Sequence, residues 1–110
     1  GLALYKTIFA HLGEATALGN IGNVQFKQGH LKTAFESYSS ALEVHGQIGN
    51  VLGRANTMTN LGSLLIRMGR REEALRMLLS AQQLYEVTGV QTKGTEAATE
   101  LLARLDLEGH

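Results

Sequence analysis

Residues 18–41 read LGNIGNVQFKQGHLKTAFESYSSA, and residues 58–81, forty positions later, read MTNLGSLLIRMGRREEALRMLLSA. Six identical pairs relate the two stretches: Asn20 and Asn60, Gly22 and Gly62, Gly29 and Gly69, Ala34 and Ala74, Ser40 and Ser80, and Ala41 and Ala81. Gly13 with Gly53 and Gly49 with Gly89 extend the match on both sides. Matches concentrated at small residues indicate an internal repeat, and such a period is typical of solenoid proteins.

Each repeat has the pattern of a helix, a turn and a second helix. Leu18, Ile21 and Gly22 have the three-to-four spacing of one helical face, and Gly29 and Gly69 are expected to end helices in the left-handed conformation. The apolar periodicity predicts helices at 2–9, 14–28, 31–47, 54–68 and 71–87, with a weaker sixth at 95–106.

Glycine inside a helix costs up to about 1 kcal/mol relative to alanine, so Gly22 and Gly62 need a compensating role. We expect the two helices of each unit to approach most closely there, with Ala34 and Ala74 as the small partners across the contact. A phosphate-binding role is disfavoured because no Gly-x-Gly-x-x-Gly spacing occurs.

Composition restricts the functional classes. The chain has 110 residues and a formal net charge of zero, which disfavours nucleic-acid binding. It contains no cysteine, and no apolar run approaches the length that spans a membrane. We therefore expect a cytoplasmic location without membrane association. Because the sequence begins with Gly1, we interpret it as an internal segment of a longer protein.

The two units resemble tetratricopeptide repeats. The resemblance rests on Leu18-x-x-Ile21-Gly22-x-x-Gln25 followed by Ala34-x-x-x-Tyr38 and Ala41, and on the equivalent residues of 58–81. The forty-residue period looks most like the long-helix variety of kinesin light chains and the Pins/LGN group. The resemblance implies an all-α fold, a right-handed superhelical stack of antiparallel helix pairs. It predicts one domain over 1–110: the second helix of a preceding unit (1–12), two repeats (13–50 and 53–90) and a terminal helix (94–108).

The resemblance also implies a scaffold that binds a peptide or helix of a partner protein on its concave face. The expected binding residues are Thr16, Asn20, Asn23, Lys27, Asn56, Asn60, Ser63, Arg67, Glu96 and Glu100. Asparagine amides both donate to and accept from a peptide backbone. A structural alternative for Asn20 and Asn60 is a hydrogen bond to a neighbouring repeat.

Heat-shock co-chaperones with this fold hold an acidic carboxy-terminal tail with asparagines and basic residues. Asn23 and Asn60 match those asparagines, but Gly19 replaces a lysine, and Glu96 and Glu100 occupy basic positions. We therefore expect a partner of mixed charge and no binding of that tail.

Catalysis and oligomerisation are two other functional classes. Catalysis is disfavoured because His11, His30, His45 and His110 share no metal-ligand spacing and no nucleophile motif occurs; no cofactor or metal is expected. Oligomerisation is the alternative function, because helices 2–9 and 95–106 both present apolar faces that uncapped solenoid ends expose.

Overall fold

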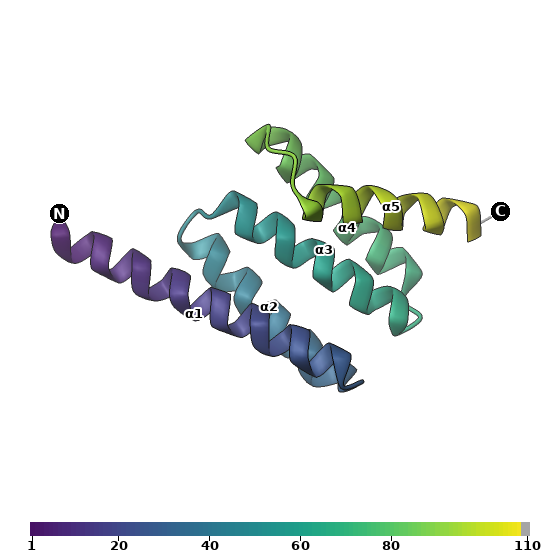
Figure 1. Ribbon diagram of the computed structural model, residues 1–110, viewed down its shortest axis with the longest axis horizontal. Coiled ribbons are helices and arrows are strands. Elements are labelled where there is room, and N and C mark those ends of the chain that lie inside the picture. Colours follow the sequence, from purple (N-terminus) through teal and green to yellow (C-terminus); the bar gives the residue numbers. More distant parts are fainter. Residues whose placement is uncertain (109–110) are drawn as a thin grey trace.

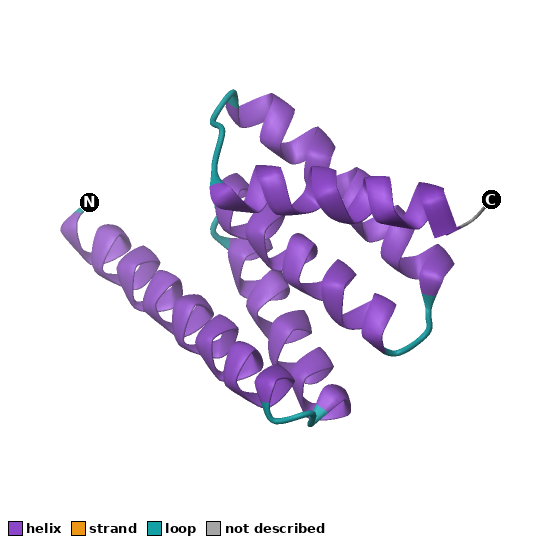
Figure 2. Ribbon diagram, turned by 45° about the vertical axis from the view of Figure 1, so that its right-hand side comes forward, coloured by secondary structure: helices purple, strands orange, loops and turns teal. Residues whose placement is uncertain are grey.

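The computed structural model describes residues 1–108, which form five helices joined by short turns (Figures 1 and 2). The helices are α1 (Leu2–Lys27), α2 (Leu31–Gln47), α3 (Val51–Arg67), α4 (Arg71–Thr88) and α5 (Lys93–Glu108). No strand occurs within residues 1–108. The predicted all-α class is confirmed.

The helices stack in two layers. Figure 1 shows α1, α3 and α5 in the nearer layer and α2 and α4 behind them. Helix α1 pairs with α2 and α3 with α4, while α2 also packs against α3 and α4 against α5. The shortest dimension is 19 Å, which matches two layers of helices of about 10 Å diameter each. The arrangement is the predicted solenoid of helix pairs.

Glycine terminates each of the first four helices. Gly29, Gly49, Gly69 and Gly89 have φ angles of +81°, +69°, +78° and +68°. Only glycine adopts this left-handed region without steric cost, and it lets the chain reverse after a helix. The prediction that Gly29 and Gly69 end helices is confirmed, and Gly49 and Gly89 do the same at the alternate turns.

The predicted break between helices 2–9 and 14–28 is wrong, because α1 is continuous from Leu2 to Lys27. The four turn glycines recur every twenty residues, and the position twenty before Gly29 is Phe9, whose side chain disfavours a positive φ. Gly13 does not adopt positive φ and lies inside the helix. Residues 2–12 therefore do not form a separate second helix of a preceding unit.

Two other boundaries also differ from the prediction. Helix α3 begins at Val51 rather than 54, because the side chain of Asn50 accepts a hydrogen bond from the backbone N–H of Gly53 at 3.1 Å and caps the helix. Helix α5 is a full helix over Lys93–Glu108 rather than a weaker one over 95–106.

The predicted close approach at the mid-helix glycines is confirmed, but its partners are different. A Cβ placed on Gly22 would lie 2.7 Å from Cδ1 of Tyr38, and one placed on Gly62 would lie 2.5 Å from Cδ2 of Leu78. Ala34 and Ala74, the expected partners, are fully buried but do not supply the atoms nearest to these Cβ positions. The large side chains of Tyr38 and Leu78 therefore fill the space that the glycines leave.

Helix α3 is the centre of the core. It contributes eight buried residues, whereas α1 contributes only Ala15 and Gly22. Leu61, Leu64 and Leu65 are the largest of its fully buried side chains. Of the helices described, none combines the length and apolar character needed to cross a bilayer.

Candidate functional site

Two adjoining hollows lie on the faces of α1 and α3 in the nearer layer, and together we call them the inner groove. The first has a volume of about 370 Å³ and is lined by Thr16, Gly19, Asn20 and Asn23 of α1 and by Asn56 and Asn60 of α3, among others. The second has a volume of about 320 Å³ and is lined by Asn23, Phe26, Lys27, Tyr38, Asn60 and Ser63. Asn23 and Asn60 line both hollows, so the two adjoin along α1 and α3.

The structure brings most of the predicted site residues together here. Those that line the inner groove are Thr16, Asn20, Asn23, Lys27, Asn56, Asn60 and Ser63. The other three lie outside both hollows. Arg67 is exposed in the last turn of α3, and Glu96 and Glu100 are exposed on α5.

A buried tyrosine orients the side chain of Asn23. The hydroxyl of Tyr38, on α2, donates a hydrogen bond to Oδ1 of Asn23 on α1. Burial raises the pKa of Tyr38 above its usual value, so the hydroxyl keeps its proton and remains a donor at neutral pH. With its oxygen occupied, Asn23 presents its Nδ2 amino group as a donor to a ligand.

A second tyrosine holds Asn56 in the same way. The hydroxyl of Tyr85, on α4, donates to Oδ1 of Asn56 at 2.6 Å and lies 3.2 Å from Oγ1 of Thr59. Burial raises the pKa of Tyr85, and hydrogen bonds to Thr59 and Thr92 partly oppose that shift. The second layer of helices thus fixes two amides of the first layer.

Asn20 and Asn60 have no comparable partner. Within residues 1–108 neither side chain makes a hydrogen bond, and Asn20 is exposed while Asn60 is half-buried. The alternative role, a hydrogen bond to the neighbouring repeat, is therefore not observed for this pair. Both amides keep a donor and an acceptor available for a ligand.

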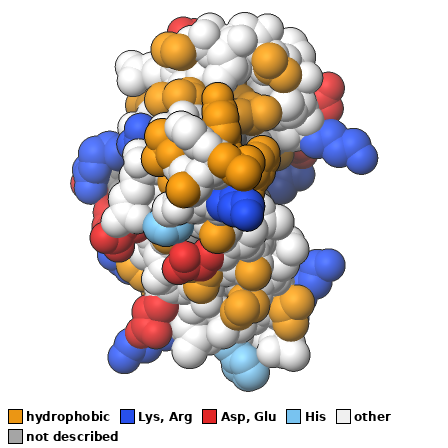
Figure 3. Space-filling view, turned by 90° about the vertical axis from the view of Figure 1, so that its left-hand side faces the viewer, with side chains coloured by type: hydrophobic (Ala, Val, Ile, Leu, Met, Phe, Trp, Pro, Cys, Tyr) orange, Lys and Arg blue, Asp and Glu red, His pale blue; other side chains and the backbone are white. Residues whose placement is uncertain are grey.

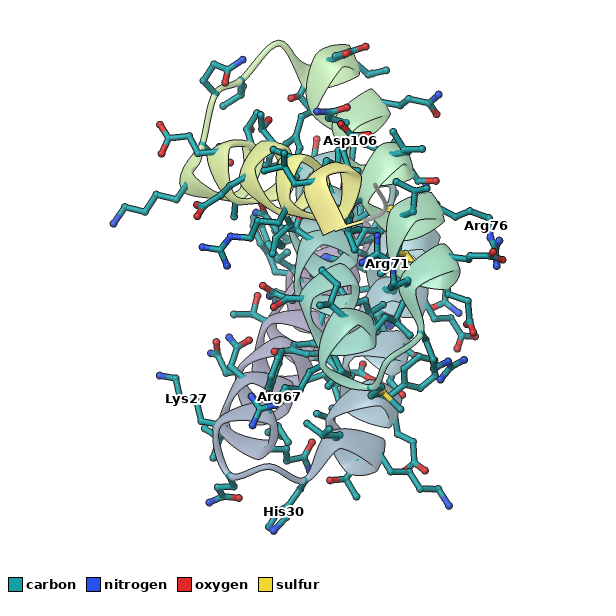
Figure 4. The ribbon with its side chains drawn as sticks, turned by 90° about the vertical axis from the view of Figure 1, so that its right-hand side faces the viewer. Lys27, His30, Arg67, Arg71, Arg76 and Asp106 are labelled. Atoms are coloured by element: carbon teal, nitrogen blue, oxygen red, sulfur yellow. The ribbon has the colours of Figure 1, made fainter. Side chains whose placement is uncertain are left out.

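Charge is uneven along the inner groove. Lys27 and Arg67 lie at the same end of the molecule, in the last turns of α1 and α3 (Figure 4). No ion pair involves either of them within the described part of the chain. On α5 the carboxylate of Glu100 pairs with Arg104 at 2.7 Å, so part of the expected acidic edge is already neutralised.

Histidine has a structural role at the turn between α2 and α3. His45 is buried, and its Nδ1 lies 3.1 Å from Nδ2 of Asn50. Burial lowers the pKa of His45, which favours a neutral ring. In the part of the chain that the structure describes, no three potential ligand side chains are grouped to hold a metal ion; His110 lies outside it.

Sequence reasoning missed the supporting roles of Tyr38 and Tyr85. It named Tyr38 as part of the repeat pattern but assigned no partner to its hydroxyl. Because a buried tyrosine hydroxyl usually needs a hydrogen-bond partner, that requirement was the available signal. It also missed the hydrogen bond that Ser37 donates to Gln25 at 2.7 Å, which joins α2 to α1.

Comparison with known proteins agrees with this architecture. A family model described as "Tetratricopeptide repeat" matches residues 13–87. A protein of Schizosaccharomyces pombe named "DnaJ homolog subfamily C member 7 homolog" is 34% identical over 70 residues. That match covers 64% of this chain but only 14% of the yeast protein. No solved structure matches the chain significantly.

Proposed function

Since the chain belongs to the tetratricopeptide repeat family, whose members generally serve as protein-interaction scaffolds, we propose that its inner groove binds a peptide segment of a partner protein. The observation that carries this proposal is the set of amides along one groove. Asn20 and Asn60 are unbonded within residues 1–108, and Asn23 and Asn56 each have an amino group available. These groups suit the carbonyl and N–H groups of an extended backbone.

The ends of the inner groove define the partner further. Lys27 and Arg67 favour an acidic side chain at one end of the peptide, while Glu96 on α5 favours a basic side chain toward the other end. Phe26, in the second hollow, offers a surface for an apolar side chain. We therefore propose a peptide of mixed charge with an apolar residue near its acidic end.

A peptide array tests the proposal directly. Ten-residue peptides of varied sequence are probed with the wild-type chain and with the double variant Asn20→Ala/Asn60→Ala. We expect the wild type to bind a subset of peptides and the variant to lose at least tenfold in affinity, because two charge-free amide contacts are each worth about 1 kcal/mol. Gln83→Ala, an exposed change on α4, is the control and should leave binding unchanged. Equal binding by the double variant would exclude the inner groove as the site.

The subtype and the division into units also remain proposals. The forty-residue period and the helices of 17 and 18 residues in α2, α3 and α4 support the long-helix variety. Repeats at 13–50 and 53–90 follow from the same period. A cytoplasmic location, proposed from the lack of cysteine, is testable by imaging a tagged chain.

Self-association is a second candidate function, favoured by the exposed apolar residues of α1. Leu2 is 73% exposed, Leu4 61% and Phe9 67%. Figure 3 shows apolar side chains gathered over the end of α1 that points toward the viewer. Two copies could bury these side chains against each other. Light scattering over a range of concentrations tests this, and a monomer at all concentrations excludes it; Phe9→Glu should dissociate any dimer.

A further inference from the structure

A third hollow, on the other side of α3 from the inner groove, lies between α2 and α4. Its volume is about 340 Å³, and we call it the outer groove. Phe35 and Leu42 of α2 and Met77 of α4 form its walls, and Met58 and Leu65 of α3 form its floor. This volume lies at the lower end of the range for ligand pockets, roughly 300–1,000 Å³.

The position of the outer groove follows from the packing of the second layer. Helices α2 and α4 share no Cα pair within 8 Å in residues 1–108, whereas both pack against α3. Because the backbones of α2 and α4 are this far apart, their side chains leave a channel between them whose floor is α3. Met58 and Leu65 are seven residues apart, which places them on one stripe of α3.

The inner and outer grooves use opposite stripes of α3. Asn56, Asn60 and Ser63 follow four-and-three spacing along the inner stripe. On a helix of 3.6 residues per turn, Met58 lies about 160° around the axis from Asn60. A ligand in one groove therefore does not obstruct the other.

Positive charge is in excess at the rim of the outer groove. The guanidinium of Arg70 lies 5.2 Å from the ring centre of Phe35 and donates two hydrogen bonds to the carboxylate of Glu73, at 2.8 and 2.6 Å. Glu73 is thereby matched mainly by Arg70, with a smaller electrostatic attraction to Arg76. Arg76, also at the rim, is exposed and makes no ion pair with any described residue.

We propose that the outer groove binds an amphipathic helix of a partner protein, with a large apolar side chain between Phe35 and Met77 and a carboxylate one helical turn away against Arg76. Apart from the exposed hydroxyl of Ser80, the floor and walls are apolar, so most of the occupant's backbone must satisfy its own N–H and C=O groups, as a helix does. Methionine side chains adapt to apolar groups of different shape. The charge of Arg76 selects acidic over basic occupants.

This binding site makes the chain a scaffold with two separate surfaces. It rests on different residues from the inner groove, so either site can fail without affecting the other. If both are occupied, the chain connects an extended peptide on one side to a helix on the other.

The methionines provide a test that needs no natural partner. The chain has three methionines, of which Met58 and Met77 line the outer groove and Met68 does not. The probe is a stapled alanine-based helix carrying one leucine and one glutamate a turn apart, and the control helix carries lysine in place of the glutamate. With methyl-labelled methionine in NMR, we expect the glutamate helix to shift the Met58 and Met77 signals more than the Met68 signal.

Reversing the charge on the probe helix or at position 76 distinguishes the proposed contact with Arg76 from nonspecific apolar binding. We expect the lysine helix to bind about threefold more weakly than the glutamate helix, and Arg76→Glu to reverse that order. Arg104→Glu, the same change at an exposed position of α5, should preserve the order. The Asn20→Ala/Asn60→Ala variant should bind the glutamate helix as the wild type does.

Three results would overturn the proposal. They are the absence of methyl shifts at millimolar glutamate helix, equal affinity for the two helices, and an unchanged order in folded Arg76→Glu. Circular dichroism verifies that each variant retains its helical content, and exposure of Arg76 makes its replacement compatible with folding.

Discussion

At the scale of single residues, glycines with the same backbone conformation have opposite roles. Gly22 and Gly13 both lie within α1 and both have helical φ angles. A Cβ on Gly22 would meet the ring of Tyr38, whereas a Cβ on Gly13 would meet nothing within 4 Å. The packing partner, rather than backbone conformation, therefore decides whether alanine is acceptable.

Substitution of these two glycines should change stability in opposite directions. Gly22→Ala should destabilise the fold by about 1–3 kcal/mol, because a Cβ 2.7 Å from Cδ1 of Tyr38 forces a core side chain to move. Gly13→Ala should stabilise by up to about 1 kcal/mol through helix propensity. Urea denaturation measures both, and equal effects would show that the close contact is relaxed without cost.

The hydroxyl of Tyr38 can be removed without removing its ring. In Tyr38→Phe the ring still packs beside Gly22, but Oδ1 of Asn23 loses its donor. We expect a loss of about 1 kcal/mol in the free energy of unfolding, and weaker binding of inner-groove peptides because the amide of Asn23 can then rotate. Tyr5→Phe, at an exposed tyrosine, is the control for both measurements.

The buried ring of His45 predicts a dependence of stability on pH. Because burial lowers its pKa in the folded state, the unfolded chain binds the proton more readily. Stability should therefore decrease as the pH falls through the unfolded value of about 6.5 and level off below the folded pKa. Thermal unfolding at about pH 7.5 and about pH 5.5 measures the change. His45→Gln should reduce the difference in stability between the two pH values.

At the scale of helices, α1 and α3 differ in how much of their length is supported. Residues 1–10 are all exposed, whereas α3 has eight buried residues. Most helical stability in proteins comes from packing of a buried face, so length alone does not protect α1. Residues 2–10 are helical, but no buried side chain supports them, so the hydrogen bonds within α1 hold them in the helix.

Hydrogen exchange should reveal that difference within one molecule. We expect the amides of residues 5–10 to exchange much faster than those of α3, because fraying of α1 exposes no core. Exchange followed by mass spectrometry resolves the two segments. Similar protection in both would mean that something covers the end of α1, and repeating the measurement at low concentration would show whether a second copy does so.

At the scale of the whole molecule, α3 separates a polar groove from an apolar one. The amide-bearing stripe of α3 lines the inner groove, and Met58 and Leu65 form the floor of the outer groove. The net charge is zero, so association with a partner depends on where charges lie rather than on their sum. Lys27 and Arg67 concentrate positive charge at one end of the inner groove.

The distribution of charge predicts a negative result with chaperone tails. An acidic carboxy-terminal chaperone peptide needs several cations along the groove, but Gly19 occupies one such position and Glu96 lies on α5. We expect no binding at micromolar concentration by calorimetry at low salt. Micromolar affinity would contradict the expected mixed-charge partner. Gly19→Lys with Glu96→Lys should increase affinity for the same peptide.

Local features of the sequence were sufficient to predict the helix pairs and the turns at Gly29 and Gly69. Helical periodicity and the left-handed preference of glycine act over a few residues, and the forty-residue repeat extends them along the chain. The wrong prediction at residues 2–12 has a local cause as well. The repeat suggested a break there, but no glycine stands at position 9 to turn the chain.

Only the tertiary structure decided which side chains meet across the helices. The contacts of Gly22 with Tyr38, of Tyr38 with Asn23 and of Arg70 with Phe35 depend on the axial offset and rotation of neighbouring helices. A repeat period specifies that helices pair but not that offset, which the side chains settle by filling space together. For this reason the sequence predicted an asparagine-lined inner groove, whereas the tyrosines that orient it and the outer groove became visible only in the folded chain.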